Sequence, residues 1–191
     1  SSISWFMRVL NESIARKANL EDECKGRFWE GRFKSQALLD EAALAACLAY
    51  VDLNPVRAKA ADLPEESDYT SIKSRINAAQ DKKQPKSLMR FAGKPRKHMP
   101  KGLPFELKTY LNLVDWTGRT IREGKPGKIP EDALPILERL NICSGNWLTL
   151  TTSFTCSFKN TAGKEQAITA YTNQMKRKRR SSIANSLALF A

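Results

Sequence analysis

Apolar positions in the first third of the chain switch from helix-like to strand-like spacing. Within residues 3–18 apolar side chains recur every three or four positions, which predicts an amphipathic helix. Residues 28–39 begin with aromatic side chains and continue in alternation, which predicts a strand over residues 28–38. The aromatic residues of this segment, Phe28, Trp29 and Phe33, are expected either to pack against helix 3–18 or to stack on unpaired bases.

A second helix is expected over residues 40–54. Asp40 is a good N-cap, and Glu41 places a negative charge in the first turn, where the helix dipole favours it. The helix is expected to end at Asn54, because a residue that precedes proline is pushed out of the helical region. The expected buried stripe consists of Leu44, Cys47, Leu48 and Val51.

The rest of the chain divides by pattern into three parts. Residues 77–102 are rich in lysine, arginine and proline, which predicts a basic linker with little structure of its own. Residues 103–160 regain helical patterning and are expected to form a small helical tail with Trp116 and Trp147 in its core. Residues 161–191 contain the cluster 176–180 and are expected to be disordered. Residues 1–76 are then the first domain, a helix–strand–helix arrangement of the α+β class.

The charge distribution points to a polyanionic partner. The 191 residues carry a net charge of +12. Residues 1–76 are nearly neutral, with 11 Lys/Arg against 12 Asp/Glu, whereas residues 77–101 carry 8 against 1 and residues 161–191 carry 6 against 1. Clustered cations of this kind gain affinity for nucleic acid by releasing phosphate counterions. A ribosomal or histone-like protein would be basic throughout, so we expect a globular part with basic extensions.

The remaining composition excludes several other classes of protein. The four cysteines form no Cys-x-x-Cys pair and the one histidine cannot complete a zinc site, so reduced intracellular thiols are expected. The longest apolar run, Ala42–Val51, is too short to span a bilayer. We expect a soluble, cytoplasmic, nucleoid-associated protein without a membrane partner. Because the chain starts at Ser1 and runs straight into helical pattern, we interpret it as a C-terminal fragment.

The most informative residues lie at the end of helix 40–54. Tyr50 and Asn54 are one helical turn apart and project from the same face, and Arg57 follows just beyond the helix. A phenol, a carboxamide and a guanidinium together could attack, orient and neutralise a phosphodiester. Each residue also has a structural interpretation: a tyrosine at the edge of the core, an asparagine at a helix end and a solvated arginine.

Two motifs resemble a known enzyme family. The segments Gly26-Arg27-Phe28-Trp29-Glu30-Gly31-Arg32-Phe33 and Tyr50-Val51-Asp52-Leu53-Asn54-Pro55-Val56-Arg57-Ala58 are similar to the IS200-like single-tyrosine transposases, closest to the branch associated with repetitive extragenic palindromes. The resemblance covers residues 3 to about 76. It implies a truncated ferredoxin-like transposase domain in which Tyr50 attacks a DNA phosphodiester, forms a 5′-phosphotyrosine bond and frees a 3′-hydroxyl.

The same resemblance implies a divalent metal, Mg²⁺ or Mn²⁺, with Asn54 completing its site. The family also needs a His-hydrophobic-His pair, and this sequence contains only His98, within the basic linker. We therefore expect the metal in a full-length enzyme, no cofactor in this chain alone, and no DNA cleavage by this chain alone.

The expected partner is single-stranded or hairpin DNA, and a homodimer is compatible with the resemblance. Two other functions remain open: a non-catalytic protein that binds DNA hairpins, and an RNA-binding helical protein that uses the basic linker. The expected DNA contacts are Arg57, Arg27, Arg32, Lys82, Lys83, Lys86, Arg96 and Lys97.

Overall fold

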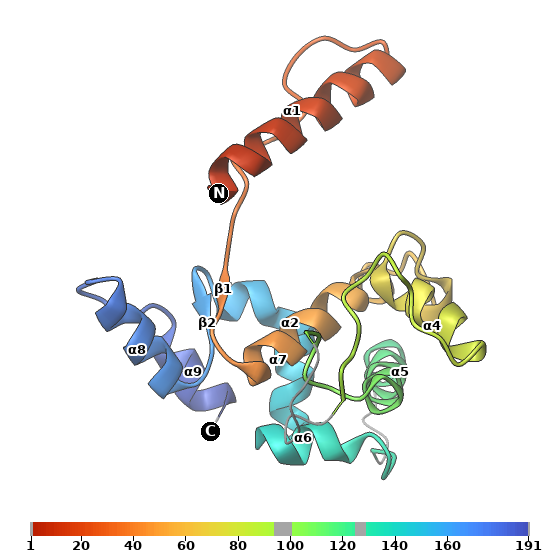
Figure 1. Ribbon diagram of the computed structural model, residues 1–191, viewed down its shortest axis with the longest axis vertical. Helices are drawn as coiled ribbons and strands as arrows, with labels where there is room; N and C mark the ends of the chain where they lie inside the picture. The colour runs from red at the N-terminus through yellow and green to blue at the C-terminus, as the bar shows by residue number, and fades with distance from the viewer. Residues whose placement is uncertain (1, 94–100, 125–128, 191) are drawn as a thin grey trace. The chain divides into compact units, whose positions relative to one another are not determined.

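The computed structural model describes residues 2–93, 101–124 and 129–190. The chain separates into two compact units, Ser1–Ser35 and Gln36–Ala191. The boundaries expected near residues 76, 102 and 160 therefore all lie inside the second unit. The architecture is mainly helical with one small parallel sheet, which agrees with the α+β class (Figure 1).

The first unit consists of helix α1 (Ile3–Glu21) and an irregular segment that follows it. The helix expected over residues 3–18 is confirmed and extends three residues further. Residues 28–36 form no strand, so the strand expected over residues 28–38 is wrong for most of its length. Its aromatic side chains are used differently: the Trp29 indole N–H donates to the Asn11 carbonyl at 2.9 Å, and the Trp29 ring meets Phe28 edge-on.

Only the end of the expected strand finds a pairing partner. Strand β1 (Ala37–Leu38) pairs in parallel with β2 (Thr161–Ala162), which lies more than a hundred residues further along the chain. A strand needs a neighbour for its backbone N–H and C=O groups, and β2 is long enough to serve these two residues. The sheet thereby ties the C-terminal segment to the start of the second unit.

Helix α2 (Glu41–Asp52) follows β1, and its boundaries have clear local causes. The Asp40 carboxylate caps it by accepting the Ala43 N–H at 2.9 Å. Pro55 has no N–H to continue the ladder, and it starts the short helix α3 (Asn54–Arg57) instead.

The buried face of α2 is not the expected stripe. Leu44, Cys47 and Leu48 are half-buried and pack against the core, but Val51 is 56 % exposed. Alanines occupy the fully buried apolar positions of α2, and their small side chains allow other helices to approach it closely. These alanines are Ala42, Ala43, Ala45, Ala46 and Ala49.

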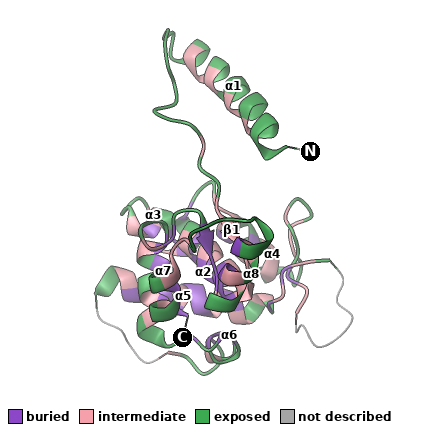
Figure 2. Ribbon diagram, turned by 90° about the vertical axis from the view of Figure 1, so that its left-hand side faces the viewer, coloured by how far each residue is buried: buried purple, intermediate pink, exposed green. Residues whose placement is uncertain are grey.

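Most of the remaining helices contribute buried residues to one core with α2, while α8 (Glu165–Gln174) packs against α9 (Ile183–Leu189); Figure 2 shows the buried residues by colour. Trp147 and Trp116 are both buried, as expected, and the Trp147 indole donates to the Thr117 hydroxyl at 2.9 Å. The helices are α4 (Ser71–Gln80), preceded by the 3-10 turn η1 (Pro64–Glu66), then α5 (Leu107–Glu123), α6 (Leu134–Leu140), α7 (Ser144–Ser157), α8 and α9.

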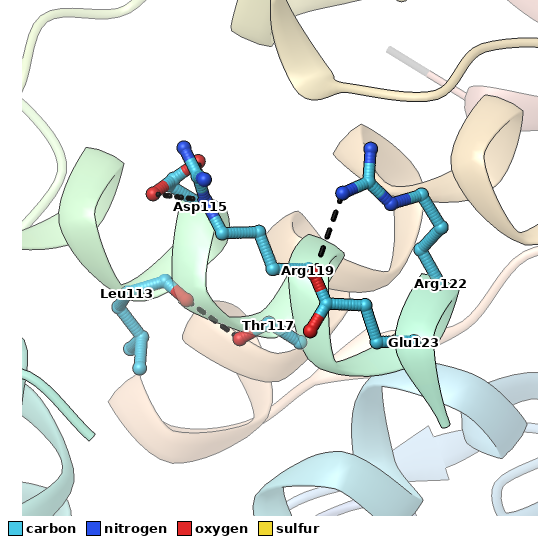
Figure 3. A network of polar contacts seen from close by, with 6 residues as sticks. All are labelled: Leu113, Asp115, Thr117, Arg119, Arg122 and Glu123. Carbon is cyan, nitrogen blue, oxygen red and sulfur yellow. Dashed lines mark hydrogen bonds and ion pairs between the residues drawn. The ribbon is translucent and has the colours of Figure 1, made fainter. Parts of the chain in front are cut away.

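Helix α5 separates its buried and exposed faces by chemistry. Thr117 donates to the Leu113 carbonyl at 2.6 Å while it accepts the Trp147 indole, so its buried hydroxyl is satisfied. The exposed side carries ion pairs of Arg119 with Asp115 and of Arg122 with Glu123 (Figure 3). The strongly amphipathic sequence thus directs its apolar face into the core.

Residues 161–190 form a short strand and two helices, in contrast to the disorder expected from the charge of residues 161–191. Sequence composition suggested solvation, but β2 and helices α8 and α9 bury enough apolar surface to order the segment. Phe190 is 3 % exposed and stacks on Phe158, with ring centroids 5.4 Å apart. The Lys164 N–H also donates to the Asp40 carboxylate at 2.5 Å, which joins the segment to the cap of α2.

Candidate functional site

Tyr50 lies in the last turn of α2 at the edge of the core. Its ring packs against Phe154 of α7, with centroids 6.0 Å apart, and one side of the residue remains accessible. The phenol oxygen lies 2.9 Å from the Thr155 hydroxyl, and Thr155 is itself exposed. The oxygen proposed to react is therefore at the surface and is not sealed in the apolar interior.

Arg57 folds back from α3 onto the tyrosine. Its guanidinium carbon lies 3.8 Å from the centroid of the Tyr50 ring. One nitrogen, Nη1, donates to the Tyr50 carbonyl at 2.5 Å and to the Thr151 carbonyl at 3.1 Å. Partial burial lowers the pKa of Arg57 from its ordinary value, and Tyr50 opposes that shift. The side chain is thus a cation held at a fixed position over the phenol.

Asn54 completes the cluster from the first turn of α3. Its side chain is exposed, and its Oδ1 accepts a hydrogen bond from Arg57 Nη2 at 2.9 Å. Arg57 therefore contacts both Tyr50 and Asn54, but Asn54 begins α3 and so does not lie on the helix of Tyr50, where the spacing had predicted it. The close pairing of Asn54 with the guanidinium was not predicted.

These residues do not fit a divalent metal as they stand. The amide oxygen expected to be a ligand already faces a guanidinium, whose positive charge opposes a second cation at the same oxygen. Among the described residues no cluster of three or more His, Cys, Asp or Glu side chains could hold a metal ion. His98 lies outside the described residues.

Helix α7 supplies two groups that sequence reasoning missed, the Thr151 carbonyl and the Thr155 hydroxyl. Helix α7 is kinked at Ser153, which has φ −128° and ψ 23°. The Thr151 and Thr152 hydroxyls bond back to carbonyls one turn earlier, a pattern that bends helices. The kink lies between Thr151 and Thr155, so it sets how both meet α2. The run of threonines was the only sequence signal.

A second polar cluster is buried beneath this site. Asp52 is 1 % exposed and accepts hydrogen bonds from Tyr110 at 2.6 Å and from Ser71 at 2.7 Å. Burial raises the pKa of Asp52, although its hydrogen bonds and Arg75 pull the other way. Burial also raises the pKa of Tyr110 well above its usual value. Sequence reasoning missed this cluster, because an aspartate inside Tyr50-Val51-Asp52 carries no sign of its distant partners.

The expected DNA-contacting residues are distributed over both units. Arg27 and Arg32 are exposed in the first unit, and Arg57 lies at the tyrosine. Lys82, Lys83 and Lys86 are exposed or half-exposed together in the loop after α4, whereas Arg96 and Lys97 lie outside the described residues. Of the cluster 176–180, Arg180 pairs with Glu165 at 3.4 Å.

The helices that the structure describes include none that is both long and apolar enough to cross a membrane. No family model, curated protein or solved structure was found to match this chain. The function of the chain must therefore be inferred from the geometry of Tyr50, Asn54 and Arg57.

Proposed function

We propose that Tyr50 is the nucleophile of a DNA transposase of the single-tyrosine kind, and that this chain supplies the tyrosine half of the active site. One observation carries the proposal: an accessible phenol oxygen, with a guanidinium held 3.8 Å from its ring by two backbone carbonyls and the Asn54 amide. An accessible phenol beside a fixed cation offers the two groups that attack on a phosphodiester would need.

The chemistry is an exchange of one phosphodiester for another. The Tyr50 oxygen attacks phosphorus and forms the O–P bond, the bond from phosphorus to the DNA 3′-oxygen breaks, and that oxygen takes up a proton as a free 3′-hydroxyl. The phenol gives up its proton in the same exchange, so atoms and charge balance. Because the 5′-phosphotyrosine keeps the energy of the phosphodiester, rejoining needs no nucleotide.

Arg57 would contribute its positive charge, which favours a phosphate close to the Tyr50 ring. Its other contacts are to uncharged oxygens, so within the described residues no carboxylate at the site competes with an incoming phosphate.

The metal-binding part of the proposal lies outside this chain. The family resemblance calls for Mg²⁺ or Mn²⁺ on a His-hydrophobic-His pair, and a sequence with one histidine cannot supply that pair. We propose that another polypeptide segment carries it, together with the rest of a ferredoxin-like sheet. This chain alone is then expected to bind DNA without cutting it, in the cytoplasm and close to the nucleoid.

One observation favours the non-catalytic alternative, a protein that binds DNA hairpins without cleaving them. The Asn54 oxygen is already engaged by Arg57, so the site is better suited to bind a phosphate than to admit a metal. The two functions differ in whether a tyrosine–DNA bond can form once the histidine pair is present.

The proposal is tested in this chain by following Tyr50 itself. With ring-labelled tyrosine, the NMR signal of Tyr50, identified with Tyr50→Phe, is expected to move when hairpin DNA is added. Binding itself is followed separately by fluorescence anisotropy, so that a signal that stays is read only where the DNA is bound. If DNA binds and the Tyr50 signal stays in place, the tyrosine is not at the DNA and the proposed function fails.

A further inference from the structure

The loop between α4 and Phe91 is built as a defined structure and is not an open linker. The Gln84 carboxamide donates to the Phe91 carbonyl at 3.0 Å and accepts the Phe91 N–H at 2.7 Å, as a paired strand residue would. Residues 84 and 91 are thus clasped together, and the chain between them forms a closed loop.

Both ends of this loop are anchored to the second unit. At its start, the Lys82 and Lys83 N–H groups donate to carbonyls at the end of α4, each at 2.9 Å. At its end, Phe91 is 5 % exposed and packs against the Tyr110 ring, with centroids 4.9 Å apart. Leu103 pairs with the chain beside Phe91, its N–H donating to the Arg90 carbonyl at 2.8 Å.

Four cationic residues line a hollow of about 460 Å³ over this loop. No acidic side chain lines the hollow. Within the described ranges none of the four takes part in an ion pair, although six other ion pairs are formed. The lining residues are Lys82, Lys83, Gln84, Pro85, Lys86, Leu88 and Arg90.

A neighbouring hollow of about 500 Å³ extends the cationic surface. It shares Lys82, Lys83 and Gln84 with the first and adds Lys108 from α5. Glu106 also lines it, so the positive charge is least opposed over the loop itself. Together the two hollows form an extended cationic surface, which suits a chain of negative charges better than one compact anion.

We infer that residues 82–90 form a preformed phosphate-binding loop that receives the DNA backbone, with Gln84 as the clasp that holds its cations in place. Several unpaired cations spread along one hollow match the regular phosphates of a nucleic acid, and each contact releases a counterion. This inference rests on the proposed function for the choice of DNA over other phosphate polymers.

Gln84→Ala tests whether the structure of the loop matters for DNA binding, because it removes the hydrogen bonds to Phe91 and leaves the net charge unchanged. Affinity for a labelled DNA hairpin is measured by fluorescence anisotropy over a series of salt concentrations. Opening the clasp is expected to weaken binding by roughly three- to tenfold, because the loop must then be ordered upon binding. Gln80→Ala, an exposed glutamine at the end of α4, is the matched control and should bind as the unchanged chain does.

A charge variant keeps the test valid if Gln84→Ala unfolds the loop more widely. Lys86→Ala is expected to flatten the dependence of log K on log salt by about 0.9 if one phosphate contact is lost. Lys159→Ala removes an equal charge from an exposed site that does not line the hollow and should leave the slope nearly unchanged.

The phosphate-binding loop would be overturned if Gln84→Ala and Gln80→Ala bound the DNA hairpin with equal affinity and the salt dependence of binding had equal slopes for Lys86→Ala and Lys159→Ala. Tighter binding of an RNA hairpin of the same sequence at the same salt would overturn the choice of DNA. A loop that binds DNA while the Tyr50 signal stays still would support the loop and defeat the proposed nucleophile.

Discussion

The side-chain oxygens of Tyr50 and Thr155 lie 2.9 Å apart although 105 residues separate them along the chain. The contact joins α2, which carries the family-like motif, to α7, which lies outside the resemblance. Helix α7 therefore belongs to the site, and the tail cannot be regarded as an appendage to it.

Removing the Thr155 hydroxyl is expected to release the Tyr50 phenol without unfolding the chain. Thr155→Val keeps the shape of the side chain, and losing one exposed hydrogen bond costs about 0.5–1 kcal/mol. The ring NMR signal of Tyr50 should shift, and Thr155→Ser should restore it. A signal that Thr155→Val leaves in place would mean that the hydroxyls do not hold one another in solution.

Arg57 is expected to matter for both the site and stability. Truncation by Arg57→Ala removes a charged donor from two carbonyls and a cation from the face of an aromatic ring, and should lower the free energy of unfolding by about 2–3 kcal/mol. Arg57→Lys keeps the charge but not the planar guanidinium, so its free energy of unfolding, measured by denaturant titration, should lie between those of the unchanged chain and Arg57→Ala. Equal stability of all three chains would contradict a stabilising role for the Arg57 contacts.

Asp52 should make stability fall as pH rises. Burial lifts its folded pKa above the ordinary value of 3.8, so between these two values the folded chain holds more protons than the unfolded chain. The contribution is fully present below 3.8 and is lost as pH rises through the folded pKa. Chemical denaturation of the unchanged chain and of Asp52→Asn, compared from about pH 3.5 to pH 7, should show their difference shrinking or reversing in that direction. A difference that grows with pH would show that Arg75 outweighs burial.

The Asp40 carboxylate is expected to hold the C-terminal segment in place. Asp40→Ala removes the cap of α2 and the acceptor of the Lys164 N–H together, at a cost of about 2–4 kcal/mol. Asp40→Asn keeps one acceptor oxygen and should cost less. Limited proteolysis should cut residues 161–191 sooner in the alanine variant than in the asparagine variant. Equal protection in both would contradict the role of the carboxylate.

Local signals in the sequence predicted local structure well. The cap at Asp40, the break at Pro55 and the helical period of residues 3–18 each depend on neighbours within one or two turns, and each is confirmed. The cluster of Tyr50, Asn54 and Arg57 was predictable for the same reason, because its members lie within eight residues of one another.

Pairings between distant segments could not be predicted. The strand expected over residues 28–38 shrank to Ala37–Leu38 because, in the part of the chain that the structure describes, β2 alone pairs with it, and nothing at residue 28 reveals that. The charge of residues 161–191 suggested disorder, whereas the burial of Phe190 and the bond from Lys164 to Asp40 decide its structure. Thr155 and the clasp at Gln84 were missed because a lone threonine or glutamine has no pattern to read.

The central claim, that Tyr50 joins covalently to DNA, is tested most directly by mapping the adduct. This chain is incubated with hairpin DNA, Mn²⁺ and a histidine-bearing segment that supplies the metal pair. The products are then digested with trypsin and nuclease. The peptide 35–57 contains Tyr50 as its sole tyrosine, and mass spectrometry should find it carrying a 5′-nucleotide in the unchanged chain and not in Tyr50→Phe. An adduct that persists in Tyr50→Phe, or that maps to Tyr69, Tyr110 or Tyr171, would contradict the account.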